Sequence, residues 1–146
     1  MAENLKVNHY NNGDEITLHE TGSYMSYYEG QYAVSPYADI YGYHYNASAV
    51  RDARGVCPEG FHVPNNEDWD ILTNYLGGSS NDGVAGGKMK STGTIEDGDG
   101  YWLSPNVGAT NVSGFTAIPA GWFGYMAFSN DGDPCDNMGC AGKSAF

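Results

Sequence analysis

The run of residues 57–69, which reads CPEGFHVPNNEDW, constrains the fold more than any other part of this sequence. Pro58 and Gly60 favour a tight turn, and Pro64 biases the residues before it towards extended backbone. Either of the two asparagines at 65–66 can then cap a helix, whose acidic first turn suits the helix dipole. A turn, a short extended piece and a helix start are therefore expected within one short stretch.

Apolar residues follow this start at helical spacing, at Trp69, Leu72 and Leu76. Residues three and four apart lie on one face of a helix, so we expect this face to be buried. The glycines at 77–78 end the helix, which places it over residues 66–76. Because deleting a buried aromatic side chain costs about 3–5 kcal/mol, we expect Trp69→Ala to unfold the domain.

Short elements separated by long loops are expected elsewhere. A strand over residues 3–10 is expected to turn at residues 11–14 and to return through residues 16–18. A short helix is expected over residues 46–53, and residues 84–91 fit either a helical turn or a strand. We expect loops with short extended pieces over residues 20–40, loops over residues 94–111 and extended backbone over residues 114–128. Two helices with short strands and loops indicate an α+β class.

The acidic balance of the chain limits its partners. Eighteen acidic residues against six basic ones give a formal net charge of −12. Nucleic acid and anionic membrane surfaces carry the same sign of charge, so neither is expected as a partner. No apolar run approaches the roughly 20 residues that span a bilayer, so membrane insertion is not expected either. The length fits one domain with its own core, over residues 1–146.

Tyrosine is unusually frequent, and eight of its twelve copies lie between Tyr24 and Tyr45. Two interpretations compete for this segment. Tyrosine offers a large amphipathic contact area at small entropic cost, which suits recognition of a ligand or a protein. Alternation at Tyr41, Tyr43 and Tyr45 instead turns one face of a strand inward, which favours a role in the core slightly.

Two acidic runs are candidate calcium sites, and calcium is the one cofactor that the sequence suggests. The first run contributes Asp97 and Asp99, and the second contributes Asp131, Asp133 and Asp136. Oxygen ligands at alternate positions, with glycines between them, allow a loop to wrap tightly around Ca²⁺. Neither run completes an EF-hand loop, and solvated turns are the commoner use of such sequences.

Neither the cysteines nor the histidines indicate a catalytic centre. Cys57, Cys135 and Cys140 leave one thiol unpaired if a single disulfide forms, and several pairings stay open. A disulfide is expected if the protein is exported. The four histidines are scattered, without a Ser-His-Asp or paired-carboxylate pattern, so the chain is not expected to be an enzyme.

Six shorter runs accompany CPEGFHVPNNEDW in an order that resembles the Fibrobacter succinogenes major paralogous domain family, found in secreted and surface proteins of bacteria. The resemblance extends from residue 1 to about residue 122 and leaves residues 123–146 as a divergent tail. The runs are MAENLK at 1–6, YGYHYN at 41–46, DARG at 52–55, VAGGKMK at 84–90, SPNVGATN at 104–111 and GFTAIP at 114–119.

The resemblance implies a fold like that of C-type-lectin-like and formylglycine-generating-enzyme-like domains. Such a domain packs two short helices on a small, twisted antiparallel sheet with long loops. The family usually continues through further strands to a late cysteine, so the resemblance implies that the C-terminal strands are missing here. It also implies that Cys57 pairs with that late cysteine, a role that Cys135 or Cys140 could take over.

An extracellular or cell-surface location follows from the resemblance, and two functions fit it. The first is a non-catalytic structural protein that self-associates into oligomers or fibres, because a sheet without its last strands leaves an open edge for a neighbour. The alternative is an adhesin-like recognition module for a glycan or a surface protein. Self-association is slightly favoured. The candidate contact residues of the alternative are Trp102, Trp122, Phe123 and Tyr125.

Overall fold

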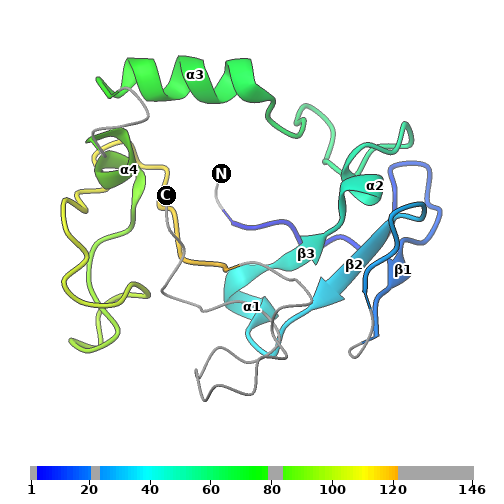
Figure 1. Ribbon diagram of the computed structural model, residues 1–146, viewed down its shortest axis with the longest axis horizontal. Coiled ribbons are helices and arrows are strands. Elements are labelled where there is room, and N and C mark those ends of the chain that lie inside the picture. Colours follow the sequence, from blue (N-terminus) through cyan, green and yellow to red (C-terminus); the bar gives the residue numbers. More distant parts are fainter. Residues whose placement is uncertain (1–2, 21–23, 79–83, 122–146) are drawn as a thin grey trace. The chain divides into compact units, whose positions relative to one another are not determined.

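The structure, a computed structural model, describes residues 3–20, 24–78 and 84–121. Within these ranges the contacts define two compact units, Glu3–Val63 and Pro64–Gly121. The N-terminal unit holds a small sheet and two short helices, and the C-terminal unit holds one longer helix and one short helix (Figure 1). Each unit has a hydrophobic cluster of its own.

The described part of the N-terminal unit is built on a three-stranded sheet with the order β1-β2-β3 (Figure 1). β1 (Thr17–Leu18) pairs in parallel with β2 (Gln31–Val34), and β2 pairs antiparallel with β3 (Tyr43–Tyr45). The sheet is mixed, so the prediction of an antiparallel sheet was wrong for β1. The reason is the long connection over residues 19–30, because parallel neighbours need a crossover rather than a hairpin turn.

The predicted turn after Tyr10 is present, but the strand over residues 3–10 is not. The Gly13 backbone N–H donates to the Tyr10 carbonyl oxygen at 2.9 Å, which closes the turn. A single antiparallel bridge between His9 and Glu15 is all that this hairpin forms in the described residues. The prediction failed because the segment before the turn finds a different neighbour.

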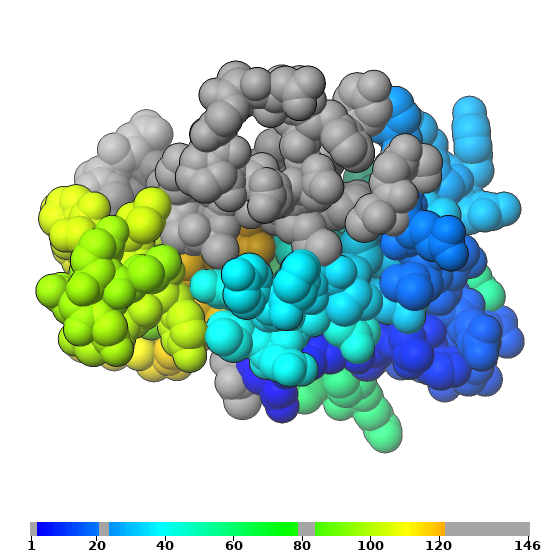
Figure 2. All heavy atoms as spheres, turned by 90° about the horizontal axis from the view of Figure 1, so that it is seen from below, coloured from blue at the N-terminus to red at the C-terminus, as the bar shows by residue number. Residues whose placement is uncertain are grey.

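That neighbour is β3, and residues 4–7 run along the side of β3 that does not pair with β2. The backbone N–H of Tyr43 donates to the Leu5 carbonyl oxygen at 2.9 Å. The Tyr45 hydroxyl donates to the Val7 carbonyl oxygen at 2.7 Å. Figure 2 shows the dark-blue N-terminal segment against the cyan residues near position 40. The outer side of β3 is therefore occupied by the chain itself.

Tyrosine rings dominate the packing of this unit. The Tyr32 ring stacks on the Tyr43 ring with centroids 5.2 Å apart, and it meets the Tyr45 ring at 6.3 Å. Tyr43 and Tyr45 are half-buried beside the core, as their alternation predicted, whereas Tyr41 ends a helix. The fully buried members of this core are Tyr10, Ile16, Tyr32, Ala49 and Val56.

Two single-turn helices flank β3 in the chain. α2 (Ala47–Val50) is shorter than the predicted 46–53, because the chain turns again immediately after it, with the Gly55 N–H bonded to the Asp52 carbonyl oxygen at 3.0 Å. α1 (Ala38–Tyr41) was not predicted. Its N-cap, Tyr37, makes no side-chain capping bond, so the sequence carries no local start signal there.

The C-terminal unit begins with α3 (Asn66–Tyr75), which agrees with the predicted 66–76 to within one residue. Asn65 is the N-cap, and it forms a capping box with Asp68 through bonds of 3.1 Å and 2.9 Å. Gly77, at φ 77°, follows the end of the helix in a conformation that glycine adopts readily.

α3 buries less than predicted, because no residue within it is fully buried. Trp69 remains 38% exposed, and its ring meets Phe115 with centroids 6.2 Å apart. The prediction of a buried Trp69 was wrong because the facing helix, α4 (Val84–Met89), is only six residues long. The buried cluster between them is limited to Leu76, Ala85 and Met89, with Leu72 and Phe115 half-buried against it.

Long loops complete the described part of the chain. Helix α4 settles the ambiguity over residues 84–91 in favour of helix. Residues 114–121 contain one bridge, Ala117 with Lys90, rather than the predicted extended segment, of which residues 122–128 lie outside the described ranges. The described residues thus form a mixed α/β fold with four helices, two more than predicted, and a small mixed sheet. The predicted loss of C-terminal strands concerns residues that are not described.

Candidate recognition site

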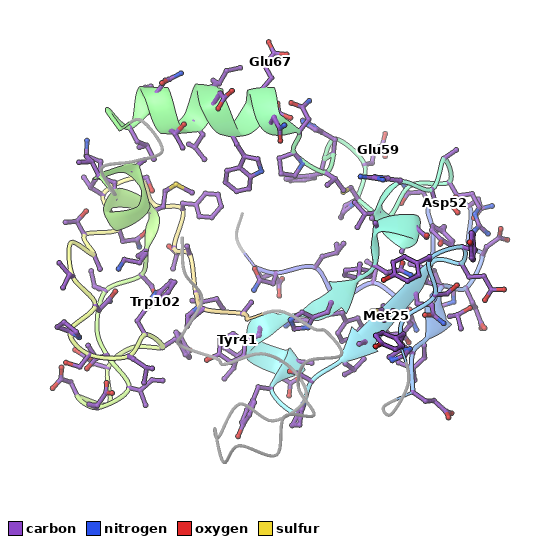
Figure 3. The ribbon with its side chains drawn as sticks, viewed as in Figure 1. Met25, Tyr41, Asp52, Glu59, Glu67 and Trp102 are labelled. Carbon is purple, nitrogen blue, oxygen red and sulfur yellow. The ribbon has the colours of Figure 1, made fainter. Side chains whose placement is uncertain are left out.

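The loop that leads into β2, residues 24–30, carries the most exposed aromatic side chains of the N-terminal unit. Tyr27 is 85% exposed and Tyr28 is 95% exposed. Tyr24 is 60% exposed, and Figure 3 locates the loop by its label on Met25. We call residues 24–30 the tyrosine loop.

Short side chains fix the backbone of the tyrosine loop from within. The Ser26 hydroxyl oxygen accepts hydrogen bonds from the backbone N–H groups of Tyr28 and Glu29, both at 3.1 Å. The Ser26 backbone N–H donates to the side-chain oxygen of Gln31, the first residue of β2, at 2.6 Å. These local bonds make a compact turn that leads directly into the sheet.

Asn46 anchors the same loop from the start of α2. Its side-chain N–H₂ group donates to the carbonyl oxygens of Ser26 and Glu29, both at 2.8 Å. Its side-chain oxygen accepts from the backbone N–H groups of Gln31 and Ala49, both at 2.9 Å. Two donors and two acceptor sites are all that an asparagine side chain offers, so Asn46 is fully used.

Ser48, which lies within α2, completes the anchoring. The Ser48 hydroxyl donates to the Tyr27 carbonyl oxygen at 2.8 Å. The backbone of residues 26–31 is therefore held by α2 and β2, while Tyr27 and Tyr28 point their side chains to solvent. The sequence matches a glycosylation pattern at Asn46, but its amide nitrogen is already occupied by two backbone carbonyls.

A partly exposed charged cluster lies over the buried ring of Tyr10 in the same unit. The Arg54 guanidinium donates to both carboxylate oxygens of Asp52, at 2.9 Å and 2.8 Å, and to Asp14 at 2.9 Å. It also lies 3.9 Å from the centroid of the Tyr10 ring. The hydrogen bonds from Arg54 lower the pKa of Asp52 to about 2 and lower the pKa of Asp14 as well. The cluster joins the first turn to the turn after α2 (Asp52 in Figure 3).

Trp102, a predicted contact residue, occupies a different position. It is only 5% exposed, and its indole N–H donates to the Ser91 hydroxyl and to the Ala117 carbonyl oxygen, both at 3.1 Å. The Lys90 ammonium lies 5.3 Å from the centroid of its ring. Figure 3 shows Trp102 among the loops of the C-terminal unit. A buried indole holds those loops together and offers little surface to a ligand.

The aspartates of the first predicted calcium run act within their own turn. The Asp97 carboxylate accepts from the Thr94 hydroxyl at 2.7 Å, and the Asp99 carboxylate accepts from the Thr94 backbone N–H at 2.9 Å. Over residues 3–20, 24–78 and 84–121, no group of three or more His, Cys, Asp or Glu side chains is placed to hold a metal ion. Calcium binding at this run therefore stays a prediction, for which the described residues offer two carboxylates.

Several predicted site residues lie outside the described ranges. Cys57 is half-buried beside the core of the N-terminal unit, but both of its predicted partners are among the residues that are not described. The predicted site residues outside the described ranges are Trp122, Phe123, Tyr125, Asp131, Asp133, Cys135, Asp136 and Cys140.

The tyrosine-rich segment between Tyr24 and Tyr45 divides into two groups in the structure. Tyr32, Tyr43 and Tyr45 pack in or beside the core, whereas Tyr27 and Tyr28 are exposed. The signal that separates the two groups is local. Ser26 precedes the exposed pair, whereas the core tyrosines alternate in strands.

None of the helices in the described ranges is long and apolar enough to cross a membrane. Comparison with curated proteins and with solved structures gave no match. The family model described as the Fibrobacter succinogenes major domain matches residues 1–135, which includes both units and extends past the expected limit near residue 122. Because this match covers most of the sequence, the chain belongs to the Fibrobacter succinogenes major domain family, a bacterial family.

Proposed function

We propose that this chain is a non-catalytic extracellular or cell-surface recognition module, which binds a glycan or a protein through the tyrosine loop. The observation that carries the proposal is the combination of exposed rings and fixed backbone. Tyr27 and Tyr28 are 85% and 95% exposed, although Asn46 and Ser48 hold the carbonyl groups of the loop.

Fixed backbone matters because binding costs entropy. A loop that is already ordered loses little conformational freedom when a partner docks, and tyrosine has only two side-chain torsions to restrict. Exposed tyrosines contribute little to the stability of the unit that carries them. Their presence on an ordered loop supports a role in contact with another molecule better than a role in packing.

The test compares partner binding of wild type with that of a double variant, Tyr27→Ser with Tyr28→Ser. The labelled protein is applied to a panel of soluble glycans and to purified surface proteins of a bacterium that carries the domain, and the bound fraction is measured. Tyr75→Ser is the matched control, because Tyr75 is 86% exposed on α3, outside the loop. We expect the double variant to lose binding and the control to keep it. Equal binding by wild type and the double variant would contradict the proposal.

Self-association into oligomers or fibres is the second candidate, and the edge of the sheet favours it. The outer side of β3 is bonded to Leu5, whereas β1 lies at the other edge with Leu18 51% exposed. A neighbouring chain could pair with β1. Light scattering after size exclusion, with electron microscopy, tests this candidate. Leu18→Lys is expected to dissociate oligomers that form through β1. A wild-type monomer near 15.7 kDa would rule out self-association.

A C-type-lectin-like fold remains part of the proposal. Its support is the short α3 that begins after Pro64, the small sheet and the long loops of the C-terminal unit. An experimental structure that includes residues 122–146 would test it. Strands from this tail that complete a sheet would agree with the fold, and a tail that adds no strand to either unit would contradict it.

A further inference from the structure

We propose that the tip of the tyrosine loop binds a basic protein segment, rich in arginine or lysine, through Tyr27, Tyr28 and Glu29. This inference rests on the proposed function and names the chemical class of its partner. The three residues are consecutive, all three are exposed, and the backbone that carries them is fixed by Ser26, Ser48 and Asn46.

Aromatic rings and a carboxylate together suit a cationic partner. The face of a tyrosine ring attracts a guanidinium or an ammonium group, and a neighbouring carboxylate can accept its N–H groups. The same unit contains this arrangement internally, where Arg54 lies 3.9 Å from the Tyr10 ring centroid and bonds to Asp52. The loop tip offers the same two kinds of group to solvent, with Glu29 in the role of the carboxylate.

The charge of the N-terminal unit points to the same partner. Residues 3–63 contain eight acidic and three basic residues. Lys6 and Arg54 form ion pairs with three of the acidic residues, and outside these pairs five acidic residues face one basic residue in this count. The net charge of the unit therefore favours a positively charged partner and disfavours an acidic polymer or a second copy of this chain, whose net charge is −12.

The experiment measures binding of a labelled peptide of alternating arginine and glycine by fluorescence anisotropy, at about 0.15 M salt, where long-range attraction is screened. The variants are Tyr27→Ala, Tyr28→Ala and Glu29→Gln. We expect each to weaken binding by about three- to tenfold. Two matched controls remove the same groups elsewhere. Tyr75→Ala removes a ring that is 86% exposed on α3, and Glu59→Gln removes an exposed carboxylate of the N-terminal unit (Figure 3).

The outcomes separate the inference from the proposed function. Loss of binding in the three loop variants, with wild-type binding in both controls, supports the inference. Equal affinity of all variants for the peptide would mean attraction to net charge alone and would overturn it. Binding of a neutral glycan or an acidic protein through Tyr27 and Tyr28, without binding of the peptide, would overturn the inference and leave the proposed function intact.

Discussion

Two loop regions of this molecule use aromatic side chains in opposite ways. In the tyrosine loop, polar side chains hold the backbone, and Tyr27 and Tyr28 are left to solvent. In the loops around residues 91–117, the aromatic side chain itself fixes the backbone, because Trp102 is buried and its indole N–H donates to both Ser91 and Ala117. An aromatic residue in a loop is therefore available for recognition only where other side chains hold the loop backbone in place.

The largest expected effect comes from removing the buried indole. Trp102→Ala should lower the free energy of unfolding by about 3–5 kcal/mol, because it leaves a cavity and removes the donor to Ser91 and Ala117. Urea denaturation measures the change. Tyr101→Ala is the adjacent control, because Tyr101 is 41% exposed and should cost far less. Similar losses in the two variants would break the contrast between the two loops.

The anchor of the tyrosine loop comes next. Asn46→Ala removes the cap of α2 and two bonds to loop carbonyls, so it should cost about 1–3 kcal/mol. Hydrogen exchange should also rise at residues 28, 29 and 31. Asn12→Ala is a milder control, since the two bonds of the Asn12 side chain, to Asp14 at 2.9 Å and 3.1 Å, lie in an exposed turn. A loop that keeps its protection without Asn46 would show that the order has another source.

A smaller loss is expected at α3. Trp69→Ala should cost about 1–2 kcal/mol, less than the sequence alone predicted, because Trp69 is 38% exposed and its ring contact is with Phe115. Phe115→Ala is the partner variant. If the ring contact is what Trp69 contributes, the double variant should cost less than the sum of the two single changes. A loss at Trp69 as large as that at Trp102 would mean that α3 is buried more deeply than its exposure indicates.

Local signals explain most of what could be predicted. The start of α3 was predictable because Pro64, Asn65 and Asp68 act on neighbouring backbone. The turn after Tyr10 was predictable for the same reason.

What failed depends on distant pairing. The parallel partner of β1 lies beyond a long connection, and residues 4–7 bond to β3 although more than thirty positions separate them. The same limit applies to the site. Trp102 and Tyr28 are both aromatic residues in glycine-containing loops. Trp102 is buried through contacts with Ser91 and Ala117, 11 and 15 positions away, which the residues next to it do not reveal.

The charged cluster beside Tyr10 predicts a pH dependence. Arg54 lowers the pKa of Asp52 to about 2 from an ordinary 3.8, so this group adds stability above pH 4 and loses it as the pH falls through 2. Asp52→Asn should be less stable than wild type at neutral pH, and the two should converge near pH 2. Urea midpoints across this range measure the effect, with Glu59→Gln as an exposed control. Parallel curves for wild type and Asp52→Asn would show that the pairing contributes nothing.

The smallest effect on stability is expected where the effect on binding should be largest. Tyr28→Ala should change the free energy of unfolding by no more than about 0.5 kcal/mol, because the side chain is 95% exposed. Tyr32→Ala, at a ring that is 9% exposed in the core, should cost several times more by the same urea assay. A large loss in Tyr28→Ala would place this ring in a stabilising contact and remove the reason to assign it to a partner. If Tyr28→Ala barely changes the free energy of unfolding, recognition remains the role that the exposure of Tyr28 and the fixed backbone support. The variant then remains folded, so a loss of binding can be assigned to the missing ring.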